Sequence, residues 1–242
     1  MIKKAVLSVA ILGSIFLSAC DNTAKIPERS ESASGSTNTK PITIGYSDWP
    51  GWVAWQVAIE KGFFKEAGVN VDFKWFDYSA SMNAFAANQL DALSVTNGDN
   101  LVIASGGTQG AMIMVTDYSA GNDVIIAKNG INTIEDLKGK KIAVEKGLVD
   151  HLLLSTALTD AKIDAKDISL INSMTNELPQ VFNTPDVSAI AVWQPVANQA
   201  LKAALSEAFC SASGLLHPTM IKLEASAIDI DSFFSILYSP KI

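Results

Sequence analysis

The 242-residue sequence is poor in the side chains that most enzymes use for chemistry. It has two histidines and two cysteines, and Arg29 is its single arginine. So few imidazoles and thiols do not supply a convincing zinc site or Cys–His pair. The phosphate-binding, dinucleotide-binding, nucleophile-elbow and zinc-protease motifs are also absent. We therefore expect no catalytic residue, no metal and no cofactor, and we expect a protein that binds rather than catalyses.

The shortage of arginine also bears on the ligand and on partners. Arg29 lies in a polar N-terminal stretch, so the folded region cannot form a bidentate guanidinium clamp on a sulfonate, phosphate or carboxylate. The formal net charge is −7, which repels the phosphate backbone and makes a nucleic-acid partner improbable.

The N-terminus has the pattern of an export signal. Lys3 and Lys4 precede an apolar run over Ala5–Leu17, which is short for a bilayer span of about 20 residues. The boundary Leu17-Ser18-Ala19-Cys20 resembles a bacterial lipobox, which implies cleavage before Cys20 and a lipid on its sulfur. An ordinary secretory signal with a chance cysteine is the alternative. We expect a signal peptide over 1–19, a lipidated flexible tether over 20–40, and an exported, membrane-anchored protein.

From Pro41 onward, apolar strands alternate with helical periodicity, which predicts α/β units on mostly parallel sheets. We expect lobe I over 41–117, a hinge and lobe II over 118–202, and a tail over 203–242. The expected strands are Ile42–Tyr46, Val71–Phe76, Ala92–Thr96, Gly110–Thr116, Asp123–Ala127, Lys141–Val144, Ile168–Ile171 and Ala189–Val192. The expected helices are Trp52–Lys61, Ser79–Asn88, Leu101–Ser105, Ile134–Leu137, Val149–Ala161, Glu177–Phe182 and Pro195–Ala204.

Each expected strand of lobe I is followed within a few residues by an aspartate, and three of the four also by Trp or Tyr. Ligands of open α/β sheets bind beyond the carboxyl ends of the strands. Helix capping would explain Asp and Ser at such places, and the tryptophans could equally be core residues. The shared composition favours a ligand cleft lined by Ser47, Asp48, Trp49, Trp52, Asp77, Thr96, Asn97, Asp99, Asp117 and Tyr118.

Lobe II offers fewer candidates. Gly147 and Leu148 open a predicted helix, whose first N–H groups and dipole could hold a polar or anionic group, although Gly is also ordinary turn chemistry there. Trp193 follows the strand Ala189–Val192. A tryptophan at a strand end of each lobe would allow a ligand to be clamped from both sides.

Three segments resemble a known family: "GYSDWPGWVAWQVAIEKGFFKEAGVNV", "NTIEDLKGKKIAVEKG" and "AVWQP". In order and spacing they are similar to periplasmic substrate-binding proteins of the nitrate/sulfonate/taurine and thiamine-pyrimidine-precursor (NMT1/THI5-like) ABC importers. The resemblance covers about Pro41 to Lys202. It implies a bilobal type II periplasmic-binding-protein fold, a monomer that closes on a small-molecule ligand, and delivery to permease and ATPase subunits.

The sequence departs from this family in two places. Trp193-Gln194-Pro195 stands where many members have Trp-acid-Pro, and the tail after Lys202 no longer matches, as a truncated or divergent end would. Acids and aromatic rings without arginine favour an amine-bearing or aminopyrimidine-like ligand over nitrate, while sulfonate or taurine stays open. A sensor domain, an inactive remnant and a pyrimidine-precursor synthase are the alternative functions.

Overall fold

The structure is a computed structural model that describes residues 40–210, 219–221 and 233–238. The residues from Thr39 onward form one compact unit. The signal peptide, Cys20 and the tether predicted from the sequence lie outside the described residues.

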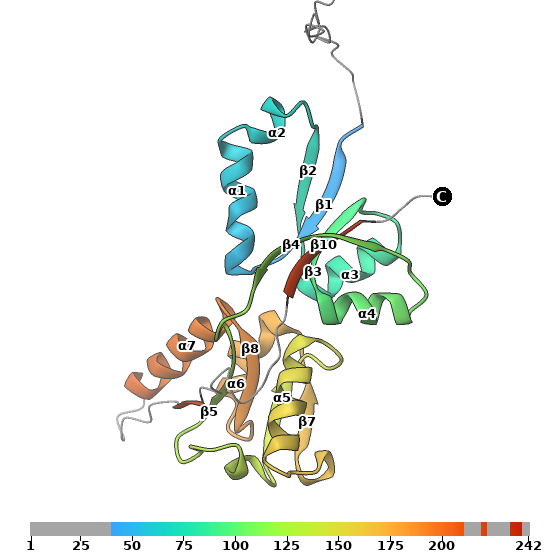
Figure 1. Cartoon of the computed structure of the whole chain (residues 1–242). Helices are drawn as coiled ribbons and strands as arrows, with labels where there is room; N and C mark the ends of the chain where they lie inside the picture. Colours follow the sequence, from blue (N-terminus) through green and yellow to red (C-terminus); the bar gives the residue numbers. More distant parts are fainter. Residues whose placement is uncertain (1–39, 211–218, 222–232, 239–242) are drawn as a thin grey trace, which may run out of the picture. The chain divides into compact units, whose positions relative to one another are not determined.

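Two five-stranded sheets organise the described chain (Figure 1). The first, in the order β2-β1-β3-β10-β4, defines lobe I, and the second, β7-β6-β8-β5-β9, defines lobe II. The strands of lobe I are β1 Ile42–Tyr46, β2 Val71–Trp75, β3 Ala92–Thr96, β4 Ala111–Tyr118 and β10 Phe233–Tyr238. Those of lobe II are β5 Asp123–Ala127, β6 Lys141–Val144, β7 Ser169–Asn172, β8 Ala189–Trp193 and β9 Thr219–Ile221.

Helices connect the strands. In lobe I they are η1 Pro50–Trp52, α1 Val53–Glu60, α2 Phe63–Glu66, α3 Tyr78–Ala86 and α4 Asn97–Ser105. In lobe II they are η2 Glu135–Leu137, α5 Val149–Asp160, η3 Ala165–Asp167, η4 Thr175–Glu177, α6 Leu178–Asn183 and α7 Val196–Cys210. The crossovers β1-α1-β2 and β6-α5-β7 each join parallel neighbours, which is the βαβ arrangement expected from the alternating pattern.

Both sheets combine parallel and antiparallel strands. β1 and β6 pair in parallel with both of their neighbours, whereas β5 runs antiparallel to β8 and β9. The register of β5 places Asp123 opposite Trp193. An antiparallel strand thus brings its first residue to the edge where the parallel strands end, which positions Asp123 beside the site described below.

The C-terminal residues return to both sheets. β9 pairs with β5 in lobe II, and β10 lies between β3 and β4 in lobe I. The chain therefore passes from lobe I to lobe II between β4 and β5, and back between β9 and β10. The boundary expected after residue 202 lies within α7, which continues to Cys210.

The expected strands and helices correspond closely to those observed, with differences at their ends, whereas α2, β9 and β10 were not expected. The helix expected from Leu101 begins at Asn97, because the Thr96 hydroxyl caps it by accepting the Asp99 N–H at 3.0 Å. The helix expected from Ser79 begins at Tyr78.

Candidate functional site

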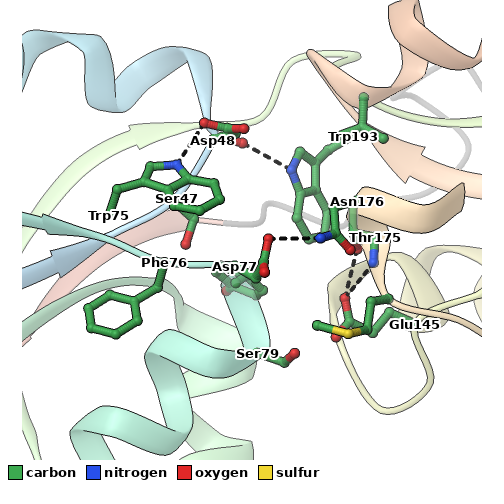
Figure 2. A pocket seen from close by; sticks show the side chains of 13 residues that line it. Ser47, Asp48, Trp75, Phe76, Asp77, Ser79, Glu145, Thr175, Asn176 and Trp193 are labelled. Atoms are coloured by element: carbon green, nitrogen blue, oxygen red, sulfur yellow. Dashed lines mark hydrogen bonds between the residues drawn. The ribbon is translucent and has the colours of Figure 1, made fainter. Parts of the chain in front are cut away.

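A pocket opens where the carboxyl ends of strands from both lobes meet (Figure 2). The space between its lining residues is about 340 Å³, and this volume includes open solvent at the mouth of the pocket. Loops after β1 and β2 line it on the lobe I side, and loops after β6, β7 and β8 on the lobe II side. Its lining residues are Ser47, Asp48, Trp75, Phe76, Asp77, Tyr78, Ser79, Glu145, Met174, Thr175, Asn176, Trp193 and Val196. We call this space the outer pocket.

Two hydrogen bonds cross from lobe II to lobe I at the outer pocket (Figure 2). The indole N–H of Trp193 donates to the backbone oxygen of Asp48 at 3.1 Å. The Asn176 amide donates to a carboxylate oxygen of Asp77 at 2.9 Å. These bonds hold the two sides of the pocket in contact.

A second, smaller pocket lies against the first and is mostly aromatic. Asp48, Thr96 and Val149 line it together with four rings: Trp49, Trp52, Tyr78 and Trp193. We call these four rings the aromatic box. Tyr78 stacks on Trp52 with 6.4 Å between ring centroids, and it meets Trp193 edge to face at 5.2 Å. All four are buried, and none is more than 6% exposed.

Asp99 lies directly behind the aromatic box, and other buried carboxylates lie near Asp99. An oxygen of Asp99 accepts the Tyr78 hydroxyl at 2.8 Å and the Thr96 hydroxyl at 2.9 Å. Asp150 follows Val149, a lining residue, and is 1% exposed. Neither of its carboxylate oxygens has a hydrogen-bond partner. One oxygen of Asp123 is likewise buried without a partner. Buried charges are normally paired, so this arrangement is costly as it stands.

The mutual repulsion of these acids appears in their pKa values. Burial, followed by the charges of Asp123, Asp99 and Glu145, raises the pKa of Asp150 well above its usual 3.8. Burial is also the main reason that the pKa of Asp123 rises to about 6. The pKa of Asp99 is raised by burial too, although hydrogen bonds from Tyr78, Thr96 and the Val149 N–H oppose that rise.

Most of the residues expected to form the cleft from sequence converge here. Ser47, Asp48, Trp49, Trp52, Asp77, Thr96 and Trp193 line one or both pockets. Three others support the walls: Asp99 as described, Leu148 by packing in the same apolar cluster, and Asp117 by accepting the Trp49 indole N–H at 2.9 Å. The tryptophans are buried among one another rather than exposed to water.

Three expected residues lie away from the pockets. Tyr118 is 63% exposed, and Asn97 uses its side-chain oxygen to accept the Gly98 N–H. Gly147 has φ of 86° and donates its N–H to His151 Nδ1 at 3.1 Å. None of the three residues lines either pocket, so none of them would touch a ligand bound there.

The structure adds several residues that the sequence did not single out. Glu145 follows β6 directly and accepts both the N–H and the hydroxyl of Thr175, at 3.0 and 2.8 Å. Glu145, Thr175 and Asn176 follow the ends of strands β6 and β7, so the rule that ligands bind beyond the carboxyl ends of strands would have selected them. Asp123 begins a strand and Asp150 lies within a helix, so that rule could not find them.

The described residues show neither a metal cluster nor a membrane span. No three His, Cys, Asp or Glu side chains in ranges 40–210, 219–221 and 233–238 come close enough to hold a metal ion. In the same part of the chain, no helix combines the length and apolar character that a bilayer crossing requires.

The model of the NMT1/THI5-like family matches residues 49–212 of this chain. The match covers most of the sequence, and the chain belongs to this family. The resemblance seen in the sequence motifs is therefore confirmed, and the match extends beyond Lys202.

Some relatives carry names that state a ligand, and two of them illustrate the similarity. The first, from Bacillus subtilis (strain 168), is described by its name as binding aliphatic sulfonates; it is 31% identical over 148 residues, which are 57% of this chain and 44% of the relative. The second is the taurine-binding periplasmic protein of Escherichia coli (strain K12), 26% identical over 160 residues, or 65% of this chain and 49% of the relative. The chain spans about half the length of these relatives.

A solved structure confirms the fold class. The crystal structure of the periplasmic aliphatic sulphonate binding protein SsuA from Escherichia coli superimposes with a TM-score of 0.65 and 20% identity, covering 83% of this chain and 65% of that one. At this identity the likeness establishes the fold alone. The chain has the bilobal α/β fold of periplasmic binding proteins that the sequence predicts.

Proposed function

We propose that the protein is the solute-binding component of an ABC importer and that it captures a small polar ligand between its lobes. The observation that carries this proposal is the outer pocket, which is lined by strand-end loops of both sheets and spanned by hydrogen bonds from Trp193 and Asn176. Membership of a family with named binding proteins supports it. On this proposal the protein is a monomer that delivers its ligand to permease and ATPase subunits.

The ligand would lie against Ser47, whose hydroxyl is buried without a partner beside the pocket. Buried polar groups normally have hydrogen bonds, so a ligand atom at this hydroxyl would stabilise the site. The residues that line the two pockets include no His, Cys or Lys. Binding without catalysis is therefore the role we propose, and a synthase would need reactive side chains other than these.

We further propose that the protein is exported and anchored through a lipid on Cys20. The basic start, the apolar run and the cysteine after Ala19 support this part of the proposal. Expression of the full chain in a bacterial host tests it by mass spectrometry of the N-terminal peptide and by membrane fractionation. Cys20→Ser should move the protein from the membrane to the soluble fraction; a Cys20→Ser protein that stays with the membrane would contradict a lipid anchor.

The binding role is tested with the chain from residue 21 onward, so that no lipid is needed. Isothermal titration with taurine, ethanesulfonate, an aminopyrimidine and nitrate should give saturable heat with at least one compound other than nitrate. Small-angle scattering with that compound should report a change between open and closed lobes. A chain that unfolds cooperatively but gives no heat and no thermal shift with any of them, nor with choline or ethanolamine, would contradict the proposal.

A further inference from the structure

We infer that the ligand class is a small organic cation, whose ammonium group binds in the aromatic box near the buried acids Asp99 and Asp150. This inference rests on the proposed function and specifies the ligand of the same site. It differs from what the names of the two relatives state, since both name compounds that carry a sulfonate.

The aromatic box supplies the first part of a cation site. Trp49, Trp52, Tyr78 and Trp193 come from both lobes and line one small pocket. The face of an aromatic ring carries negative electrostatic potential, so a cation near it is attracted, and most strongly by tryptophan. Each such contact is worth about 0.5–2 kcal/mol once water is excluded. Three of the four rings are tryptophans, and all four are shielded from water.

The buried acids supply the second part, and they are an independent observation. Asp150 is 1% exposed and unpartnered at both oxygens. Every charged neighbour that shifts its pKa is another carboxylate: Asp123, Asp99 and Glu145. Asp99 is joined to the box through the Tyr78 hydroxyl. Because Coulomb interactions are strong where water is excluded, a positive charge in the box would stabilise all of these groups together.

The lining residues are suited to a cation and not to an anion. The two pockets are lined by three carboxylates, Asp48, Asp77 and Glu145, and by no Lys, Arg or His. Ion pairs among the described residues lie elsewhere and join mostly exposed side chains, such as Lys141 with Asp186. A sulfonate in this site would have to approach several carboxylates with only hydroxyl and amide donors to offset their repulsion.

The carboxylates do not form a site for a bare metal ion. Among the described residues, no three acids, histidines or cysteines come close enough to share one. A metal ion also prefers direct oxygen ligands, whereas Asp99 is joined to the lining of the small pocket through the hydroxyls of Tyr78 and Thr96. An ammonium group on a carbon skeleton has the diffuse charge and apolar surface that such rings accommodate.

Titration calorimetry with choline, ethanolamine and ethanesulfonate tests the inference. The uncharged carbon analogue of choline, in which a tert-butyl group replaces the trimethylammonium, isolates the charge at constant shape. We expect choline or ethanolamine to bind with quenching or a shift of tryptophan emission. The tert-butyl analogue should bind at least about tenfold more weakly, a ratio equal to a loss of 1.4 kcal/mol, and ethanesulfonate should not bind.

Asp150→Asn keeps the shape of the buried side chain and removes its charge. It should weaken binding of the cation about tenfold or more, given the strength of charge interactions in a buried site. The same variant should raise the thermal midpoint of the free protein, since an uncompensated charge is removed. A merely structural role would not move affinity and stability in opposite directions. Asp160→Asn, at the exposed end of the same helix, is the matched control and should change neither.

The possible results separate the two proposals. Binding of ethanesulfonate without binding of either cation would overturn the inference and leave the solute-binding function intact. Equal binding of choline and its tert-butyl analogue would also overturn it, because charge would then be irrelevant. A cooperatively folded chain that binds none of the probes, nor taurine, the aminopyrimidine or nitrate, would contradict both proposals.

Discussion

The two βαβ crossovers of this protein share a topology and differ in burial. In lobe II, α5 packs Leu153, Leu154, Ala157 and Leu158 against the sheet. In lobe I, α1 has no buried residue, and Val53 and Val57 are 62% and 48% exposed. Both helices join parallel strands of their own sheet. The same connection can therefore carry a well-packed helix or one that leaves much apolar surface in water.

Burial also differs between inner strands of lobe II and the edge strand β4 of lobe I. All five residues of β8 and the last three of β6 are buried, whereas Ala111–Val115 of β4 are all exposed. Lobe I concentrates its burial instead on the ligand side: β3 is fully buried, and the aromatic box packs around Tyr78. Lobe II derives its stability from its two apolar clusters on the sheet, and lobe I is held to a greater degree by the side chains of the site.

Truncating one apolar residue in each crossover helix should show the difference in packing between α5 and α1 most clearly. Leu154→Ala in α5 removes a side chain that is 0% exposed, and it should cost about 2–5 kcal/mol of unfolding free energy. Val57→Ala in α1 should cost less than about 0.5 kcal/mol, as surface changes do. Urea unfolding followed by circular dichroism measures both. Similar losses for the two variants would show that α1 is as well packed as α5.

A glycine substitution tests how closely the first crossover packs on the site. A Cβ added at Gly51 would lie 1.2 Å from an Asp117 oxygen, which accepts the Trp49 indole N–H. Gly51→Ala should displace Asp117, break that bond and cost about 1–3 kcal/mol, with altered tryptophan emission. Gly98→Ala is the control: its nearest atom would be 4.0 Å away, and a helical alanine should be neutral or stabilising by about 0.5–1 kcal/mol. A Gly51→Ala variant with unchanged stability and unchanged tryptophan emission would argue against a close approach of Gly51 to Asp117.

Removing the buried carboxyl group of Asp150 should stabilise the protein, whereas most mutations destabilise a protein. Burial raises the pKa of Asp150 well above 3.8, so the folded state favours the protonated acid. At neutral pH this acid ionises more readily in the unfolded state, which costs stability, so Asp150→Asn should raise the unfolding free energy by about 1 kcal/mol or more. The gain should shrink as the pH falls towards 3.8, where the unfolded state also becomes protonated. Thermal melts between pH 4 and pH 8 check it, and a loss of stability at pH 8 would contradict the prediction.

The Asp123 carboxyl should give a pH dependence in a defined window. Its pKa rises from 3.8 to about 6 on folding, so the folded state binds this proton more tightly. Its contribution to stability is complete below the unfolded pKa and is lost as the pH rises through about 6. Asp123→Asn should therefore flatten the fall in unfolding free energy between pH 4 and pH 6 relative to the unmodified protein. An unchanged slope in this window would show that Asp123 is not the group responsible.

Surface ion pairs should contribute least, and equally, in the two lobes. Lys141 and Asp186 are 2.7 Å apart in lobe II, and Lys74 and Asp72 are 3.5 Å apart in lobe I. Both pairs are exposed, so Lys141→Met and Lys74→Met should each change stability by less than about 1 kcal/mol and less still at high salt. A larger loss for Lys141 would identify its pair as part of the lobe II packing.

Much of the fold could be predicted because it depends on local patterns. Short apolar strands at regular spacing predicted nearly all of the strands up to β8, and the aspartates at strand ends predicted most lining residues. The burial of α1 could not be predicted, because its sequence is apolar around most of the helix. β9 and β10 were also not predicted from their sequence; long-range pairing with β5, β3 and β4 defines them.

The sequence by itself determined which chemical groups are available: a single arginine that precedes Pro41 in the sequence, many aspartates, and tryptophans after strands. These follow from composition and from the alternation of apolar segments, which local backbone geometry converts into βαβ units. Only the tertiary structure decided which acids are buried together. Asp123 reaches the site because its strand runs antiparallel, and Asp150 because its helix starts there. Strand direction and burial depend on the whole chain's packing, and the electrostatics of the site follow from them.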